Sequence, residues 1–174
     1  SGKMFNALGN NNINVKAISQ GASERNISAV INKKNIKKAL NSLHETFFEK
    51  NIKEVNVFIT GVGNVGTELI NQLINQEEYL LSNLNIKINV CGVSNSKKMI
   101  INKNGININK WLKLLERGST ADPNLFLKKI KDLNLRNSIF VDNTASDIIS
   151  KFYKNYLKKS ISVVTCNKIA CADR

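Results

Sequence analysis

The sequence has few of the features that secreted or membrane proteins rely on. It has three cysteines and one proline in 174 residues. No apolar run approaches the roughly 20 residues that a membrane helix needs. The opening residues SGKMFNALGN lack the apolar stretch of a signal peptide, and Phe5 and Leu8 already share a helical face there. We therefore expect a cytoplasmic protein with no membrane partner, whose first helix starts before Ser1.

The residues that usually build metal sites are scarce. Cys91, Cys166 and Cys171 form no C-x-x-C pair and have no histidine near them, so we expect buried, reduced thiols. His44 is the only histidine, and HETFF lacks the second histidine that a metalloprotease helix would supply four residues later. We expect His44 to be exposed or to cap a helix, and we expect no metal site.

Charged residues are abundant, and basic residues outnumber acidic ones. The 26 lysines and arginines against 13 acidic residues suggest a nucleic-acid binder, since basic side chains that neutralise phosphates favour polyanions. The lysines occur in nearly every segment, however, and the scarce aromatic residues are not interleaved with them. This distribution favours a solvated surface without a nucleic-acid partner, whose field would attract an anionic cofactor.

The first 50 residues read as helix, strand, strand and helix. A helix over residues 2–10 ends at Gly9 and the asparagines after it, and INVKAIS then alternates as a strand does. A second strand, NISAVI, begins at Asn26, and Asn32 is expected to cap a helix. The apolar residues of that helix recur at helical spacing at Ile36, Leu40, Leu43 and Phe47.

From Glu54 strands alternate with helices, which is typical of a parallel sheet. We expect strands at VNVFIT, INVCGV, SIFVD and ISVVT, and helices over residues 64–76, 111–116, 123–133 and 147–158. The first of these helices carries Val65, Leu69 and Leu73 on one stripe, and Asp122 is expected to cap the third. The Asn-Gly pair within KMIINKNGININ predicts a small hairpin there.

The run GVGNVG matches the pattern G-x-G-x-x-G of dinucleotide-binding turns. Its glycines are Gly61, Gly63 and Gly66, and it lies between a predicted buried strand and a predicted helix, which is the context the pattern requires. The helix amino terminus would then face the phosphates. A glycine turn that serves packing alone is the less favoured alternative.

The run SNSKK follows the second strand, where an acidic residue would hold the ribose of NAD and repel the 2′-phosphate of NADP. Asn95 and Ser96 can instead donate hydrogen bonds, and Lys97 and Lys98 could meet the extra phosphate. NADP is therefore favoured over NAD. The alternative is that these lysines are merely solvated, with about equal weight for Lys98 and less for Lys97.

Two further runs end parallel strands, where open α/β sheets bind their ligands. VDNTAS supplies Asp142, Thr144 and Ser146, which could equally be capping groups. VVTCNK supplies Lys168, whose ammonium could orient a nicotinamide amide or a substrate carboxylate, although most lysines of this chain are expected at the surface.

These motifs, in this order, resemble the fused aspartokinase and homoserine dehydrogenase family of threonine and methionine biosynthesis. VFITGVGNVGTELINQL, VCGVSNSK, VDNTAS and VVTCNK resemble successive parts of the dehydrogenase, and INVKAISQGASERNISAVI resembles the second regulatory ACT unit. The resemblance covers the whole chain. It implies an α/β fold with a Rossmann-type parallel sheet over residues 53–174, preceded by a partial, ferredoxin-like ACT unit over residues 1–52.

The resemblance also assigns roles to individual residues. It places the diphosphate at the glycine turn, the adenosine ribose at the second strand and the nicotinamide at the two later loops, with Lys168 as the catalytic orienting group. The cofactor-binding residues it implies are Gly61, Gly63, Asn64, Val65, Gly66, Asn95, Ser96, Lys97, Thr144 and Lys168. A threonine effector would contact Gln20, Ser23 and Asn26. Family members often have proline, serine and lysine where Cys166, Ala145 and Ile169 stand.

The implied reaction is the reversible, NAD(P)-linked reduction of aspartate 4-semialdehyde to homoserine in an allosteric homo-oligomer. In this family the kinase domain precedes the ACT units, and the aspartate and lysine that handle the proton follow the cofactor domain. We therefore expect these 174 residues to bind NADPH without turnover. The alternative is a non-catalytic regulatory module that binds an amino acid or a nucleotide.

Overall fold

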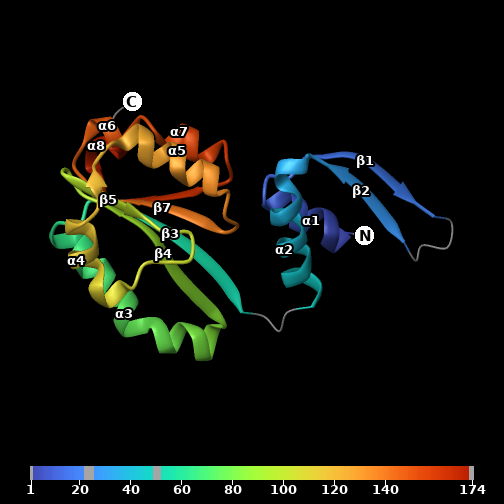
Figure 1. The fold of residues 1–174 in the computed structure, drawn as a ribbon, viewed down its shortest axis with the longest axis horizontal. Helices are drawn as coiled ribbons and strands as arrows, with labels where there is room; N and C mark the ends of the chain where they lie inside the picture. The colour runs from blue at the N-terminus through green and yellow to red at the C-terminus, as the bar shows by residue number, and fades with distance from the viewer. Residues whose placement is uncertain (1, 22–25, 49–51, 173–174) are drawn as a thin grey trace. The chain divides into compact units, whose positions relative to one another are not determined.

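The computed structural model describes residues 2–21, 26–48 and 52–172, which belong to two compact units, Ser1–Asn51 and Ile52–Arg174 (Figure 1). The first unit contains α1 (Gly2–Asn10), β1 (Val15–Gln20), β2 (Ile27–Ile31), the 3-10 turn η1 (Lys33–Asn35) and α2 (Ile36–Phe47). β1 and β2 pair antiparallel, as expected. The side chain of Asn32 accepts a hydrogen bond from the Lys34 amide and so caps η1, which leads into α2.

The apolar stripe predicted for α2 is largely wrong. Ile36, Leu40 and Phe47 are 45%, 62% and 50% exposed, and the helix buries Ala39 and Ser42 instead. Leu43 alone of the predicted stripe packs against the small core around Leu8, Ile13 and Ala39. The inner face of α2 therefore carries its small side chains, because α1 packs closely against it.

The second unit is a six-stranded sheet between two layers of helices. Its strands are β3 (Lys53–Thr60), β4 (Ile86–Ser94), β5 (Lys98–Ile101), β6 (Ser119–Thr120), β7 (Ser138–Asp142) and β8 (Ser162–Thr165). The order is β6-β5-β4-β3-β7-β8. β4, β3, β7 and β8 are parallel, β5 is antiparallel to β4, and β6 is antiparallel to β5. This is the Rossmann-type arrangement that the sequence predicts.

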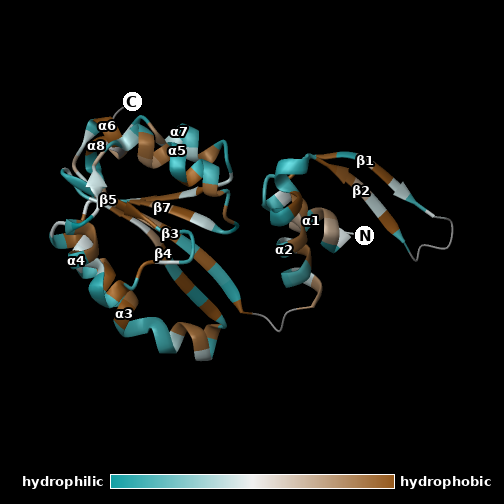
Figure 2. Ribbon diagram, in the orientation of Figure 1, coloured by the Kyte–Doolittle hydropathy of each residue, from teal (hydrophilic) through white to brown (hydrophobic). Residues whose placement is uncertain are grey.

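The helices of this unit are α3 (Asn64–Leu84), α4 (Trp111–Glu116), α5 (Pro123–Leu133), α6 (Asp147–Ser150), α7 (Tyr153–Leu157) and α8 (Lys168–Ala172), with the 3-10 turn η2 (Ile108–Lys110) before α4. In Figure 1, α3 and α4 lie on one face of the sheet and α5 and α7 on the other. Each face buries its own apolar cluster, around Ile59 and Ile70 on the first face and around Phe58 and Phe140 on the second. In Figure 2 the central strands are mixed at their starts and mostly hydrophobic toward their carboxyl ends, where β3 and β4 are buried.

Several local predictions need correction. The hairpin does not lie within KMIINKNGININ: β4 and β5 form it, because the side-chain oxygen of Asn95 accepts hydrogen bonds from the amides of Lys97 and Lys98 and closes the turn. The helix expected over residues 147–158 is divided into α6 and α7. In α3 the buried positions are Gly66 and Ile70, whereas Val65 is 57% exposed.

The cysteines also differ from expectation. All three are free, but Cys91 alone is buried, within β4, whereas Cys166 and Cys171 follow the last strand and are exposed. Burial raises the pKa of the Cys91 thiol to about 11. His44 is exposed on α2, as predicted, with its ring 5.5 Å from that of Phe48.

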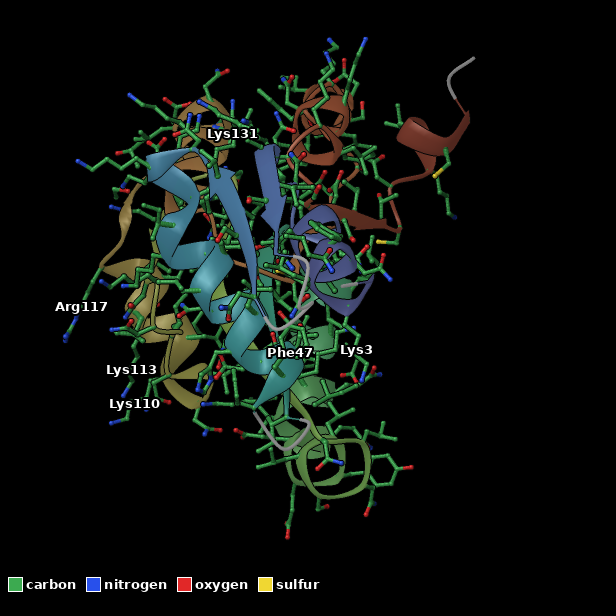
Figure 3. The ribbon with its side chains drawn as sticks, turned by 90° about the vertical axis from the view of Figure 1, so that its right-hand side faces the viewer. Lys3, Phe47, Lys110, Lys113, Arg117 and Lys131 are labelled. Carbon is green, nitrogen blue, oxygen red and sulfur yellow. The ribbon has the colours of Figure 1, made fainter. Side chains whose placement is uncertain are left out.

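Three basic side chains in and beside α4 are solvated. Lys110, Lys113 and Arg117 are exposed, and their side chains extend away from the ribbon in Figure 3. None of the described helices is long and apolar enough to span a bilayer. The described residues also contain no cluster of three or more histidine, cysteine or acidic side chains that could hold a metal ion.

Candidate functional site

The sheet changes its direction of winding between β3 and β7. From β3 the chain crosses through α3 to β4 on one side, and later returns to β7 on the other side. Ligands of open α/β sheets bind at such a point, beside the carboxyl ends of the strands. Thr60, Ser94 and Asp142 end the three strands that meet there, and all three are buried.

The glycine turn begins directly after β3. The structural reason for a glycine differs among its three glycine positions. Gly61 has a φ of +88°, and a Cβ there would lie 2.8 Å from both the Asn143 carbonyl carbon and Thr144 Cγ2. A Cβ on Gly66 would collide with the carbonyl oxygen of Gly61. Neither position can carry a side chain, because the turn, α3 and the loop after β7 approach each other too closely.

Gly63 is different, because the protein itself does not require a glycine there. Its φ is −77°, and a Cβ would meet nothing within 4 Å. Gly63 is the cap residue of α3, which has no side-chain capping bond and no acidic residue in its first turn. The space beside Gly63 is therefore open at the positive end of a helix, where an anionic group is favoured. Asn64 and Val65, the next two residues, are both exposed.

A pocket of about 270 Å³ adjoins this turn. Among the residues predicted for the cofactor, it is lined by Gly61, Asn95, Ser96 and Thr144, and it also includes Ser146. Its apolar wall comes from the second face of the sheet, where Phe140 and Tyr156 stack with ring centroids 4.1 Å apart. Polar strand ends on one side and an apolar wall on the other suit a ligand with both phosphate and ring groups.

The two lysines of SNSKK lie in different environments. Lys98 is half-buried, and its ammonium donates a hydrogen bond of 3.2 Å to the carbonyl of Gly118, at the start of β6. This bond ties β5 to the chain that follows α4, so Lys98 has a structural partner. Lys97 is exposed beside the β4–β5 turn. Of the two, Lys97 is the one available to an anion.

Asp142 is the centre of a hydrogen-bond network that the sequence did not reveal. Its carboxylate is fully buried and accepts from the Thr144 amide at 2.7 Å, from the Tyr153 hydroxyl at 2.6 Å and from Asn167 Nδ2 at 3.1 Å. Asn167 is also fully buried and donates to the Ser146 carbonyl at 2.8 Å. A buried carboxylate needs such donors, and here they fix both loops at the end of the sheet.

Burial and the neighbouring carboxylate affect the tyrosines of this region. Burial, together with the hydrogen bond to Asp142, raises the pKa of Tyr153 to about 12. Burial also raises the pKa of Tyr156. Both phenols therefore remain protonated at neutral pH, and Tyr153 is a permanent donor to Asp142.

Asn143 also belongs to this site, although it was not predicted from the sequence. Its Nδ2 atom is buried and has no hydrogen-bond partner among the described residues, while its Oδ1 accepts from the Cys166 thiol at 3.6 Å. The amide lies against the glycine turn, 3.3 Å from where a Gly66 Cβ would stand. An unsatisfied buried donor is unusual and is often found at ligand sites. Its position directly after a strand was the available signal.

Other predicted residues lie at the margin. Lys168 is exposed at the start of α8 and is not among the residues that line the pocket. In the first unit, Gln20 ends β1 and pairs with Ile27, and Asn26 immediately precedes β2, so these two residues flank the same turn. Both are exposed. Ser23 lies outside the described residues.

Comparison with known proteins matches both units to families. Residues 61–174 match the model of the homoserine dehydrogenase NAD-binding domain, and residues 1–47 match an ACT domain. A bifunctional aspartokinase/homoserine dehydrogenase of Haemophilus influenzae is 40% identical over 97% of this chain, which covers 20% of that protein. A chloroplastic counterpart of Arabidopsis thaliana is 39% identical over 96% of this chain, which covers 18% of that protein. The chain thus spans about a fifth of the length of these relatives.

Solved structures agree on the fold. A homoserine dehydrogenase of Thermoplasma acidophilum superposes with a TM-score of 0.54 at 19% identity, over 70% of this chain and 38% of the other. A hyperthermophilic archaeal homoserine dehydrogenase mutant in complex with NADPH has a TM-score of 0.56 at 23% identity, over 69% and 38%.

Proposed function

The chain belongs to the homoserine dehydrogenase family through its NAD-binding domain, and from this premise we propose that residues 53–174 bind NADPH for the interconversion of aspartate 4-semialdehyde and homoserine. The full-length protein would be a bifunctional aspartokinase/homoserine dehydrogenase, as the names of its relatives suggest. It would act as a homo-oligomer. Residues 1–52 would form part of its amino-acid-sensing ACT region.

The observation that carries the proposal is the open space at Gly63. Packing and backbone conformation explain Gly61 and Gly66, but no contact with the described residues explains Gly63. A diphosphate that approaches the backbone at this point would explain it, with Gly61, Gly63 and Gly66 shaping the turn and Asn64 and Val65 beside it at the start of α3. The side-chain Nδ2 atom of Asn143, which has no partner among the described residues, supports the same assignment because it lies against this turn.

At the adenosine end the proposal favours NADPH over NADH. Asn95 and Ser96 line the pocket, and Lys97 is exposed beside them. The ribose would lie along this turn, with Lys97 positioned to attract the 2′-phosphate and no carboxylate in SNSKK to repel it.

Thr144, which lines the pocket, and Lys168, which lies outside its lining, would serve the nicotinamide. When bound, the nicotinamide supplies the hydride, and the protein supplies position and electrostatics. Thr144 lines the pocket, and its backbone amide donates a hydrogen bond to the Asp142 carboxylate that holds it there. Lys168 follows the buried Asn167 on the neighbouring loop, from which its ammonium would orient the nicotinamide amide or the substrate carboxylate.

For the first unit we assign the effector, threonine, to Gln20 and Asn26 at the adjoining ends of β1 and β2, with Ser23 as the third residue that the family resemblance implies. Gln20 and Asn26 are exposed at adjoining strand ends, so their amide groups can reach one ligand. If this were the working site and the second unit only a scaffold, the chain would be a regulatory module.

Calorimetric titration of the folded chain with NADPH, NADH and threonine in separate experiments tests these assignments. We expect NADPH to bind more tightly than NADH. Threonine binding without binding of either dinucleotide would select the regulatory module and reject the cofactor assignment.

A further inference from the structure

The hydroxyl of Tyr153 joins the carboxyl ends of two neighbouring strands. It donates to Asp142 Oδ2 at 2.6 Å and lies 2.9 Å from Thr165 Oγ1. β7 ends at Asp142 and β8 ends at Thr165, so one oxygen atom bridges the two strand ends. Main-chain pairing also joins these residues, but it does not fix the Asp142 carboxylate.

The direction of each hydrogen bond follows from counting protons. The single hydroxyl proton of Tyr153 belongs to the short bond with the Asp142 carboxylate, so Thr165 is the donor in the 2.9 Å contact with the Tyr153 oxygen. The main-chain carbonyl oxygen of Asp142, at 3.3 Å, is a second and longer acceptor for the same Thr165 proton. Thr165 Oγ1 in turn accepts from the Asn167 amide at 2.9 Å. The result is a continuous chain of donors that ends on a buried carboxylate, and each bond of such a chain polarises the next.

This chain of hydrogen bonds ends at the two loops assigned to the nicotinamide. On the β7 side, the second carboxylate oxygen of Asp142 accepts from the amide of Thr144, which lines the pocket and packs against Gly61. On the β8 side, Asn167 directly precedes Lys168. The Tyr153 hydroxyl therefore supports both loops, together with Asn167, whose Nδ2 also donates to Asp142.

Tyr153 itself does not line the pocket, although Phe152 and Tyr156 of the same segment do. Its ring is held edge-on against Phe140, with centroids 6.4 Å apart. Its elevated pKa of about 12 keeps the hydroxyl protonated across the physiological range. Any effect of the hydroxyl on a bound cofactor must therefore pass through Asp142 and Thr165.

We propose that Tyr153 is a positioning residue for the nicotinamide half of the cofactor, which it influences by fixing the loops of Thr144 and Lys168 through Asp142 and Thr165. The inference rests on the proposed function. It adds a residue outside the pocket whose hydroxyl affects one half of the dinucleotide and not the other.

The test compares two ligands on the whole chain. NADPH contains both halves, whereas adenosine 2′,5′-bisphosphate contains the adenosine end without the nicotinamide. For Tyr153→Phe we expect the Kd of NADPH to rise about tenfold, as for the loss of a hydrogen bond to a charged group, and the Kd of the bisphosphate to stay unchanged. Thr165→Val should give the same split. Tyr79→Phe, which removes a hydroxyl from a half-exposed ring on α3, is the matched control and should change neither Kd.

The outcomes separate the inference from the proposed function. If the unmodified chain binds neither ligand, the proposed function fails. Suppose instead that the unmodified chain binds both ligands. The inference is then overturned if Tyr153→Phe and Thr165→Val weaken the binding of NADPH and of the bisphosphate equally, or weaken the binding of neither ligand. A thermal melt of each variant shows that the folded fraction is the same, and Thr165→Val keeps the test decisive if Tyr153→Phe does not fold.

Discussion

Gly66 of α3 packs against the carbonyl group of Gly61 with no room for a side chain between them. The contact brings the first turn of α3 against the end of β3, and Gly61 in turn packs against Asn143 and Thr144 of the loop after β7. The β3–α3 turn and the loop after β7, which are distant in sequence, therefore meet at these two glycines. Gly63, between them, has open space on its side-chain side.

This contrast predicts opposite results for two alanine substitutions. Gly66→Ala should lower the free energy of unfolding by about 2 kcal/mol or more, because the added methyl forces α3 away from β3. Gly63→Ala should change it by less than about 0.5 kcal/mol, since the methyl enters open space. Urea denaturation measures both values. Equal losses in the two variants would contradict the packing account.

The two lysines of SNSKK should also separate. Lys97→Glu places a carboxylate beside the proposed 2′-phosphate, so we expect the preference for NADPH over NADH to fall at least about tenfold with little change in stability. Lys98→Met removes the bond to the Gly118 carbonyl and should lower the free energy of unfolding by about 1 kcal/mol with an unchanged preference. Titrations with both dinucleotides and a urea curve for each variant check this. The reverse assignment of effects would show that Lys98 faces the cofactor.

Cys91 gives a pH dependence of known sign. Its folded pKa of about 11 lies above the ordinary thiol value of 9.0, so the unfolded chain loses this proton first as the pH rises. The contribution of the buried thiol to the free energy of unfolding is therefore constant below about pH 9. It falls by roughly 2–3 kcal/mol between about pH 9 and 11. Urea curves of the natural chain and of Cys91→Ala across this range should converge at high pH. A difference that stays constant with pH would contradict the burial of this thiol.

The sequence predicts most of the helices and strands of the second unit, but few of the hydrogen bonds between separate segments. Regular elements follow from periodicity, and Asp122 caps α5 as expected because capping is local: its carboxylate accepts from the amides of Asn124 and Leu125. The β4–β5 hairpin and the bond from Lys98 to Gly118 were missed, because each depends on a partner that no local pattern specifies.

The polar network beneath the site was missed for the same reason. The motif VDNTAS predicts Asp142 and Thr144 as site residues. Tyr153 and Asn167 belong to separate segments of the chain, and only the folded structure shows that they donate hydrogen bonds to Asp142. The stripe on α2 was misassigned because large apolar side chains were assumed to face inward, whereas Ala39 and Ser42 do so. Side-chain size is a poor guide where two helices pack closely.

The effector assignment makes a separate prediction for the first unit. Gln20→Ala and Asn26→Ala should each weaken threonine binding several-fold, because each removes an amide from the same turn. Asn41→Ala, an exposed asparagine on α2, serves as the control. Calorimetry with threonine measures the three affinities. Unchanged binding in both turn variants would place the effector elsewhere.

The central claim is that the space beside Gly63 receives the diphosphate of NADPH, and one paired measurement tests it most directly. Gly63→Asp and Gly9→Asp both place a carboxylate where the protein leaves open space, but only the first faces the proposed diphosphate. We expect the natural chain and Gly9→Asp to bind NADPH alike, and Gly63→Asp to bind at least about a hundredfold more weakly, because like charges would be juxtaposed. A folded natural chain that binds no NADPH, or a Gly63→Asp variant that binds it equally well, would contradict the account.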